Sequence, residues 1–170
     1  MQLMSRAVSN TSPLTNLAVI GRLDLVCDQL KQVAVPAAVW REMLALPHAS
    51  GRASLLAARE DGGLVVVPIA SRALAGSLRF SGLDEGESEA IALAVEISAP
   101  LLLIDEKKGR AAARRLGLSV TGALGIIAAA CKSGAIPSAS LEIRRLRMEA
   151  GFFISREVEE NTLRLAGEIP

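Results

Sequence analysis

Short apolar runs separated by helical patterns constrain the fold of this chain more than any other feature. Residues 101–104 (LLLI) are too few for a helix and lie between Pro100 and an acidic pair, which is typical of a strand buried within a parallel sheet. Three further runs of similar length occur at residues 33–35, 64–67 and 118–121. This alternation of strands and helices predicts an α/β fold with a mainly parallel sheet.

Helical segments are expected between these runs and after the last of them. They cover residues 12–21, 22–30, 36–46, 49–60, 84–97, 107–116, 122–132, 140–148 and 155–165. Ser12 and Pro13 favour the start of the first helix, as its N-cap and its first helical residue, and Gly21 closes it. Residues 68–83, which contain Gly76 and Gly82, are expected to form a polar linker.

The length of 170 residues predicts a single domain over residues 1–170 that can bury a full core. Beyond Pro137 the pattern is only helical, so residues 138–167 are expected to pack as an extension on the sheet domain or on a partner. The net charge of +1 excludes a strongly basic nucleic-acid binder. No apolar stretch approaches ~18 residues and no signal-peptide pattern opens the chain, so we expect a cytoplasmic protein that does not enter a membrane.

Polar side chains follow two of the predicted strands directly. Asn10 follows residues 4–8, and Asp105 follows residues 101–104. The carboxyl ends of parallel strands meet at one edge, where open α/β sheets place their ligand sites. A third acid from a helix would complete a divalent-metal site there. His48 is the only histidine and lies in a polar loop, so any catalysis must depend on carboxylates, hydroxyls or amines.

The helix expected at residues 84–97 offers that third acid. At about 100° per residue, Glu85, Glu89 and Glu96 share the solvent face, whereas Glu87 lies on the apolar face. A buried carboxylate is costly unless its charge is compensated. The positive end of the helix dipole or a bound cation would each compensate Glu87, which lies in the first turn.

Asp105 and Glu42 also have simpler interpretations. Asp105 could cap the helix that follows it, since aspartate is a preferred N-cap residue, and could still bind a metal through its other oxygen. Glu42 borders the apolar face of its helix, and a residue so placed is more often a surface acid. The residue patterns alone do not decide whether Asp105 is an N-cap, a metal ligand or both, or whether Glu42 is a surface acid or a metal ligand.

Five motifs in this chain resemble the sequences of PIN-domain proteins in both order and spacing. They are SNTSPL, VPAAVWREM, LDEGESEAIALA, LLLIDEKKGRAAARRLGL and VTGALGII. The sequences of these motifs are particularly similar to those of VapC-like toxins and their relatives. The similarity covers a core of about residues 4–135 and the tail GFFISREVEENTLRLAGE. The resemblance implies a three-layer α/β/α PIN-like fold with C-terminal helices.

The resemblance also implies a Mg²⁺- or Mn²⁺-dependent endoribonuclease, the toxin of a toxin–antitoxin pair. Carried over residue by residue, the metal ligands fall on Asn10, Glu42, Glu87 and Asp105, and Ser12 occupies a catalytic hydroxyl position after the first of them. The implied partners are an RNA substrate, a small antitoxin protein and a second copy in a homodimer. Asn10 stands where the family has aspartate, so a catalytically weakened PIN-fold regulatory or RNA-binding protein is the alternative.

Two basic strips could hold RNA phosphates, although a charge run on a helix is more often a solvated face. They consist of Lys107, Lys108, Arg110, Arg114 and Arg115, and of Arg144, Arg145 and Arg147. Aromatic residues are only 2% of the chain, which favours recognition of folded RNA by shape over stacking of single bases.

The apolar helices at residues 14–20 and 23–30 are expected to bury against another chain or else within the monomer.

Overall fold

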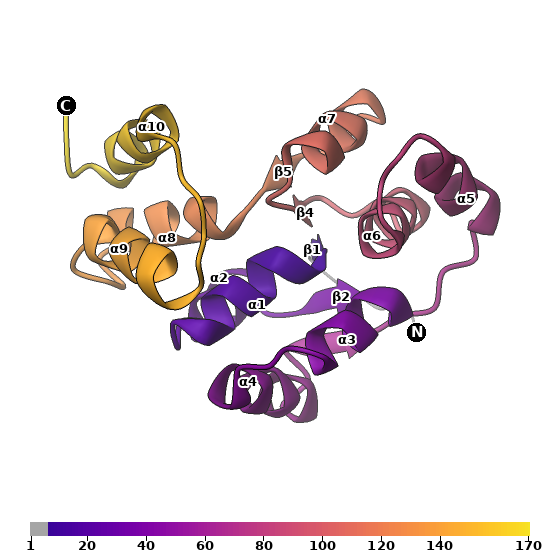
Figure 1. Ribbon diagram of the computed structural model, residues 1–170, viewed down its shortest axis with the longest axis horizontal. Helices are drawn as coiled ribbons and strands as arrows, with labels where there is room; N and C mark the ends of the chain where they lie inside the picture. Colours follow the sequence, from indigo (N-terminus) through magenta and orange to yellow (C-terminus); the bar gives the residue numbers. More distant parts are fainter. Residues whose placement is uncertain (1–6) are drawn as a thin grey trace.

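Within residues 7–170, which the computed structural model describes, five strands form one sheet in the order β3-β2-β1-β4-β5 (Figure 1). The strands are β1 (Ala7–Ser9), β2 (Val33–Val35), β3 (Leu64–Val66), β4 (Leu102–Leu103) and β5 (Val120–Thr121). All neighbouring strands are parallel, which confirms the predicted parallel sheet. The part of the first predicted strand at residues 4–6 lies outside the described residues.

Ten helices accompany the sheet in the same part of the chain. They are α1 (Thr11–Val19), α2 (Asp24–Leu30), α3 (Ala37–Leu44), α4 (Ala49–Glu60), α5 (Arg72–Phe80), α6 (Glu85–Glu96), α7 (Lys107–Arg115), α8 (Ala123–Lys132), α9 (Ala139–Glu149) and α10 (Arg156–Ala166). Helices α1, α2 and α8 lie on one side of the sheet and α5 and α6 on the other (Figure 1). The fold is therefore the expected three-layer α/β/α arrangement.

The core is built from aliphatic side chains of the sheet and of the helices on both sides. Leu14 and Leu17 are spaced three residues apart on α1 and are fully buried, as are Leu102 and Leu103 of β4 and Ile91 of α6. Burying a side chain of this kind contributes about 1.5–3 kcal/mol. This packing fixes the positions at which α1 begins after β1 and α7 begins after β4.

Strand β1 lies in the middle of the sheet. Val8 pairs with Ala34 of β2 on one side and with Leu102 of β4 on the other. The backbone N–H of Asn10 then donates to the carbonyl of Leu103 at 2.9 Å. Because the strands are parallel, the residues that follow β1, β2 and β4 emerge at the same edge of the sheet.

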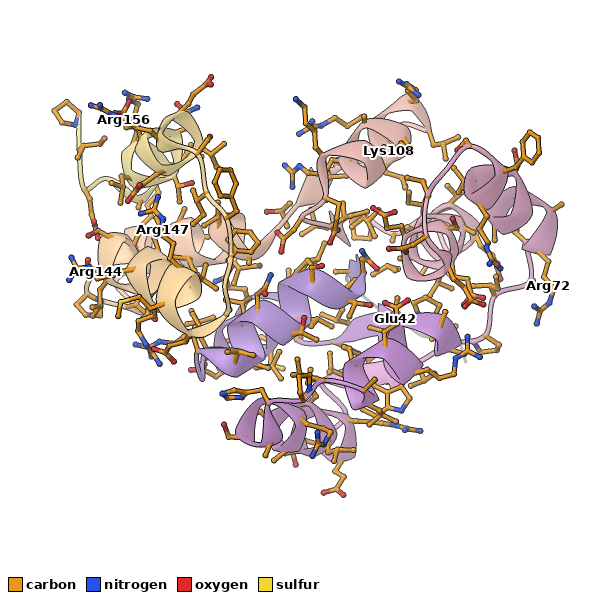
Figure 2. The ribbon with its side chains drawn as sticks, in the orientation of Figure 1. Glu42, Arg72, Lys108, Arg144, Arg147 and Arg156 are labelled. Carbon is orange, nitrogen blue, oxygen red and sulfur yellow. The ribbon has the colours of Figure 1, made fainter. Side chains whose placement is uncertain are left out.

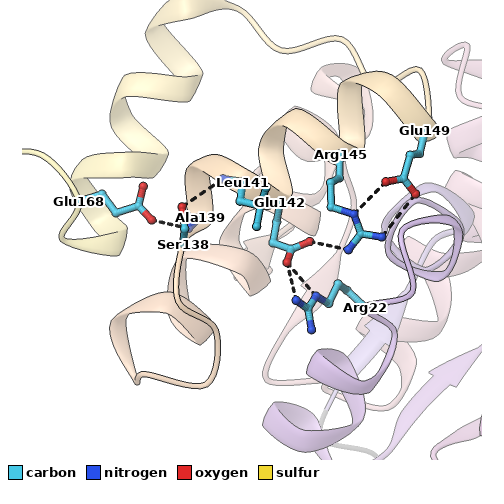
Figure 3. A network of polar contacts seen from close by, with 8 residues as sticks. All are labelled: Arg22, Ser138, Ala139, Leu141, Glu142, Arg145, Glu149 and Glu168. Carbon is cyan, nitrogen blue, oxygen red and sulfur yellow. Dashed lines mark hydrogen bonds and ion pairs between the residues drawn. The ribbon is translucent and has the colours of Figure 1, made fainter.

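The C-terminal helices pack on the sheet domain instead of extending away from it. Helix α10 packs on α8, and α9 packs on α8 and α1. The carboxylate of Glu142, which is 1% exposed, accepts hydrogen bonds from Arg22 before α2 and from Arg145 on α9 (Figure 3). Glu168 accepts from the backbone N–H groups of Ala139 and Ser140 at the start of α9. We call Arg22, Glu142 and Arg145 the arginine clamp.

Residues 68–83 differ from the predicted linker because α5 forms within them. Ala75 is buried and Leu78 packs against the core, so one face of α5 covers α6. Gly76 is tolerated on the exposed side at a cost of about 1 kcal/mol. The first helix also starts earlier than predicted, since Asn10, and not Ser12, is the residue at the N-cap position of α1.

The apolar side chains of α1 and α2 are used within the monomer. Leu14, Leu17, Leu25 and Val26 are all at most 4% exposed. Helix α1 packs on α4, α3 and α8, and α2 packs on α8, which is the second of the two arrangements expected from the sequence. Across residues 7–170, every helix is too short or too polar to span a membrane.

Candidate active site

The residues that start α1 form the centre of the candidate site. Asn10 follows β1 with an extended backbone and is 3% exposed. Its amide Nδ2 donates to Glu106 Oε2 at 3.2 Å, whereas its buried Oδ1 has no hydrogen-bond partner among the described residues. A buried acceptor without a partner costs about 1–3 kcal/mol, so this oxygen is suited to a ligand from outside the chain.

Two hydroxyl groups in the first turn of α1 hold two acids from other elements. Thr11 Oγ1 donates to Glu42 on α3, and Ser12 Oγ donates to Glu106 after β4. Glu106 thus bonds both Asn10 and Ser12. The start of α1 joins residues that are far apart in the sequence.

Glu42 reaches from α3 across the first turn of α6 (Figure 2). A Cβ atom added at Gly86 would lie 2.7 Å from Glu42 Oε1, so the carboxylate rests on the backbone of that turn. Burial raises the pKa of Glu42, and the charges of Asp84 and Glu85 raise it further, while the hydrogen bond from Thr11 lowers it. The residue pattern left the orientation of Glu42 open; the residue is exposed overall, and its carboxylate lies against Thr11 and the Gly86 backbone.

Glu87 is 6% exposed, as its place on the apolar face of α6 predicted. It forms a capping box: its Oε2 accepts from the Asp84 N–H at 3.0 Å, and its own N–H donates to Asp84 Oδ1 at 2.7 Å. A Cβ atom at Gly109 would lie 3.0 Å from Glu87 Oε1, so the other oxygen faces α7. Burial raises the pKa of Glu87, with contributions from Asp84 and Glu106.

Glu89 does not simply face solvent as predicted. It is half-buried, and its carboxylate accepts from the backbone N–H of Ala38 in the first turn of α3 at 3.2 Å. Glu89 therefore supports the helix that carries Glu42. This contact between α6 and α3 is one that helical periodicity alone does not reveal.

The side chain of Asp105 accepts a hydrogen bond from the first turn of α8, and does not cap α7 as one interpretation of the sequence suggested. Its Oδ1 accepts from the Ala123 N–H at 2.9 Å, and Asn16 Nδ2 lies 3.5 Å from its Oδ2. A Cβ atom at Gly122 would overlap Oδ1, which explains the glycine at that position. Burial raises the pKa of Asp105 to about 6, and the charge of Glu106 adds to this rise.

Glu106 is the site residue that the sequence reasoning missed. It occupies the N-cap position of α7 but makes no capping hydrogen bond with its side chain, which instead contacts α1. Successive residues beyond a strand point in different directions, so Asp105 and Glu106 diverge toward α8 and α1. The pair of acids was visible in the sequence, but only the positions of α1 and α8 decide which faces Asn10.

We call this group the strand-end site: Asn10, Ser12, Glu42, Glu87, Asp105 and Glu106. A family model described as a PIN domain (DUF3368) matches residues 6–168. The chain belongs to the PIN-domain family. The match includes every residue of the strand-end site and both C-terminal helices. No curated protein matches the chain.

Membership of the PIN family makes a nuclease-like hydrolase the expected kind of activity and raises the question of a metal. No three His, Cys, Asp or Glu side chains among residues 7–170 are gathered closely enough to form a metal cage. Mg²⁺ needs fewer, since it keeps several waters and takes one or two carboxylates from the protein. The unpartnered Asn10 Oδ1 beside the Glu106 carboxylate is an oxygen set of that kind, so the residues of this PIN domain fit a hard cation.

The two predicted basic strips of the PIN domain differ in their partners. Arg145 and Arg147 in the tail form ion pairs with Glu149 and Glu159. The cations of α7 have no carboxylate within 4 Å among the described residues. The α7 strip is thus the stronger candidate for holding phosphates.

Proposed function

We propose that this PIN domain is a Mg²⁺- or Mn²⁺-dependent endoribonuclease of the VapC-like toxin kind, which hydrolyses RNA phosphodiester bonds. One observation carries the proposal: the first turn of α1 bonds the carboxylates of Glu42 and Glu106, next to an Asn10 Oδ1 that has no partner among the described residues. The family match and the resemblance of the five motifs support it.

Asn10, Glu42, Glu87 and Asp105 were expected to hold the cation, and Glu106 joins them in the proposed ligand set. When bound, the cation would lower the pKa of a water molecule and offset charge on the phosphate. The chain itself fixes its carboxylates before any substrate arrives. Ser12 orients Glu106, and Thr11 orients Glu42.

A carboxylate with a raised pKa is suited to accept the proton that an attacking water releases. Glu87 and Asp105 both have raised pKa values because they are buried near other acids. Each also uses one oxygen to bond a helix N-terminus, so its second oxygen stays in a fixed place. A bound cation would lower the pKa of a carboxylate that it contacts, so whichever of the two does not hold the cation is the proposed proton acceptor.

The alternative is a PIN domain with weakened catalysis that binds RNA or regulates another protein. It is favoured by the contact of Asn10, whose amide donates to Glu106 where an aspartate would bring a second negative charge. A small antitoxin partner, a homodimer and a cytoplasmic location are further proposals that rest on the resemblance.

The deciding experiment is incubation of the purified protein with unstructured and structured RNAs in Mg²⁺, in Mn²⁺ and in chelator. Cleavage that appears only with metal, and is lost in Glu106→Gln, supports the ribonuclease. RNA binding without cleavage in either metal supports the alternative. Light scattering and co-expression with the neighbouring reading frame test the homodimer and the antitoxin.

A further inference from the structure

A groove of about 890 Å³ opens beside Asp105 of the strand-end site. Helix α7 and strand β5 form one wall, and α10 with the loop at residues 151–155 forms the other (Figure 2). The C-terminal helices thus contribute directly to the surface next to the proposed chemistry.

The α7 wall of the groove carries positive charge. Lys107, Arg110 and Arg114 line it, and none of them lies within 4 Å of a carboxylate in the described part of the chain. Arg110 is held in place by donating to the carbonyl of Ile104 at 2.9 Å. Burial lowers the pKa of Arg110, and the nearby charge of Arg114 lowers it further. Cations crowded in this way favour an occupant with several negative charges.

The opposite wall mixes apolar side chains with polar ones, among them Glu157 and Asn161, and contains most of the phenylalanine of the chain. Of the three phenylalanines, Phe152 and Phe153 both line this groove. Phe152 packs partly against the core, whereas Phe153 is 90% exposed. An exposed aromatic face opposite a row of cations matches the chemistry of an unpaired nucleotide, which has a flat base and an anionic backbone.

We propose that this groove binds an unpaired segment of RNA, with a base stacked on Phe153 and the adjoining phosphates on the cations of α7. The proposal rests on the proposed ribonuclease function and adds a binding groove to it, formed by α7 and the C-terminal segment beside Asp105. A duplex keeps its bases stacked inside, so it can use the cations but not Phe153. This reverses the expectation from aromatic content, because the position of the few aromatic residues matters more than their number.

The test measures binding without cleavage, by fluorescence anisotropy of the full chain in chelator with a labelled unstructured oligoribonucleotide and with the same strand in a duplex. We expect Phe153→Ala to weaken binding of the single strand about fivefold or more and to leave duplex binding unchanged. Phe153→Trp should retain the affinity. Phe80→Ala is the matched control, because Phe80 is 97% exposed on α5 and lies outside the groove.

A second pair of variants tests the cationic wall. Arg114 and Arg115 are adjacent and exposed on α7, but only Arg114 lines the groove. Arg114→Ala should lower the slope of log affinity against log salt by about 0.7, the value for one phosphate contact on a single strand. Arg115→Ala removes the same charge and should leave the slope unchanged.

Several results would overturn the groove proposal. One is equal behaviour of Phe153→Ala and Phe80→Ala, and another is a duplex bound as tightly as the single strand. A third is a co-expressed small protein whose binding is lost in Phe153→Ala while RNA binding is intact, since it would assign the groove to a protein. If the expected binding pattern appears but the wild type never cleaves RNA with Mg²⁺ or Mn²⁺, the ribonuclease proposal alone fails.

Discussion

The strand-end site and the arginine clamp both bury carboxylates, but they neutralise them in opposite ways. In the clamp, Glu142 bonds the guanidinium groups of Arg22 and Arg145. In the strand-end site, Glu106 bonds an amide and a hydroxyl, and Glu87 bonds a backbone N–H. A buried acid that already has an arginine serves the fold. A group of acids supplied only with neutral donors leaves room for a cation from solution.

The pKa values of three acids in the strand-end site reflect their burial and crowding. Burial raises the pKa of Glu42, Glu87 and Asp105, and neighbouring acids raise each of them further. Repulsion between carboxylates is a cost that the fold bears at the strand-end site. Functional sites are where such costs concentrate, because a bound cation relieves them.

The largest expected effect is loss of cleavage when an acid of the strand-end site is neutralised. Glu106→Gln and Glu87→Gln should each lower the rate of metal-dependent RNA cleavage by about 100-fold or more, since each removes a charge fixed beside the reacting phosphate. The measurement is single-turnover cleavage, with circular dichroism to confirm the fold. Glu89→Gln is the control, because it keeps an acceptor for Ala38 and should retain activity. An inactive Glu89→Gln beside an active Glu106→Gln would refute the assignment of the acids.

The next largest effect is expected on stability, when the arginine clamp is disrupted and the strand-end site is left intact. Glu142→Ala leaves Arg22 and Arg145 without their shared partner and should lower the free energy of unfolding by about 3 kcal/mol, measured by urea denaturation. Glu160→Ala removes an exposed pair with Arg156 on α10 and should lower the free energy of unfolding far less, because solvent screens that pair. Equal losses for the two variants would show that the clamp has no special role.

Asn10→Asp should bring the strand-end site closer to the usual PIN pattern. The new carboxylate replaces a donor that lies 3.2 Å from Glu106 Oε2, so the metal-free protein should become less stable. Mg²⁺ should bind about 1 kcal/mol more tightly, roughly fivefold, because an added charge lies beside the cation. Calorimetric titration checks the affinity. Asn161→Asp makes the same change on α10 and should have no effect on it; unchanged affinity in Asn10→Asp would place Asn10 outside the metal site.

A further expected effect is a pH dependence of stability in the metal-free protein. The pKa of Asp105 rises from its ordinary 3.8 to about 6 on folding, so the folded state binds the proton more tightly than the unfolded state. This contribution to stability is complete below about pH 4 and is lost as the pH rises through about 6. Thermal melts in chelator should show the fall between those values, and Asp105→Asn should flatten it. An equally steep fall in Asp105→Asn would assign the effect to another group.

The sequence predicted the strands well because each is a short apolar run between polar residues. It also predicted the burial of Glu87, which follows from the spacing of apolar residues along α6. Helix α5 was missed because glycine and polar residues obscured its narrow apolar face, which forms only against α6. Local sequence patterns were sufficient to predict a helix or strand wherever that segment buries one whole face.

Contacts between distant segments could not be predicted in the same way. The approach of Arg22 to Glu142 depends on where α9 packs, and the choice of Glu106 over Asp105 as partner of Asn10 depends on α1. The five motifs identified the family and most of the candidate residues, but they did not reveal which oxygen faces which partner. Side-chain direction beyond a strand end is a property of the assembled layers.

The central position of β1 has a consequence for the order in which this protein folds during synthesis. Val8 is flanked by Ala34 and by Leu102, so the first strand to leave the ribosome waits for one of its two neighbours until most of the chain has been made. Glu106 emerges only after that strand. A nascent chain therefore cannot complete the strand-end site early, and newly made copies lack that site until the sheet closes around β1.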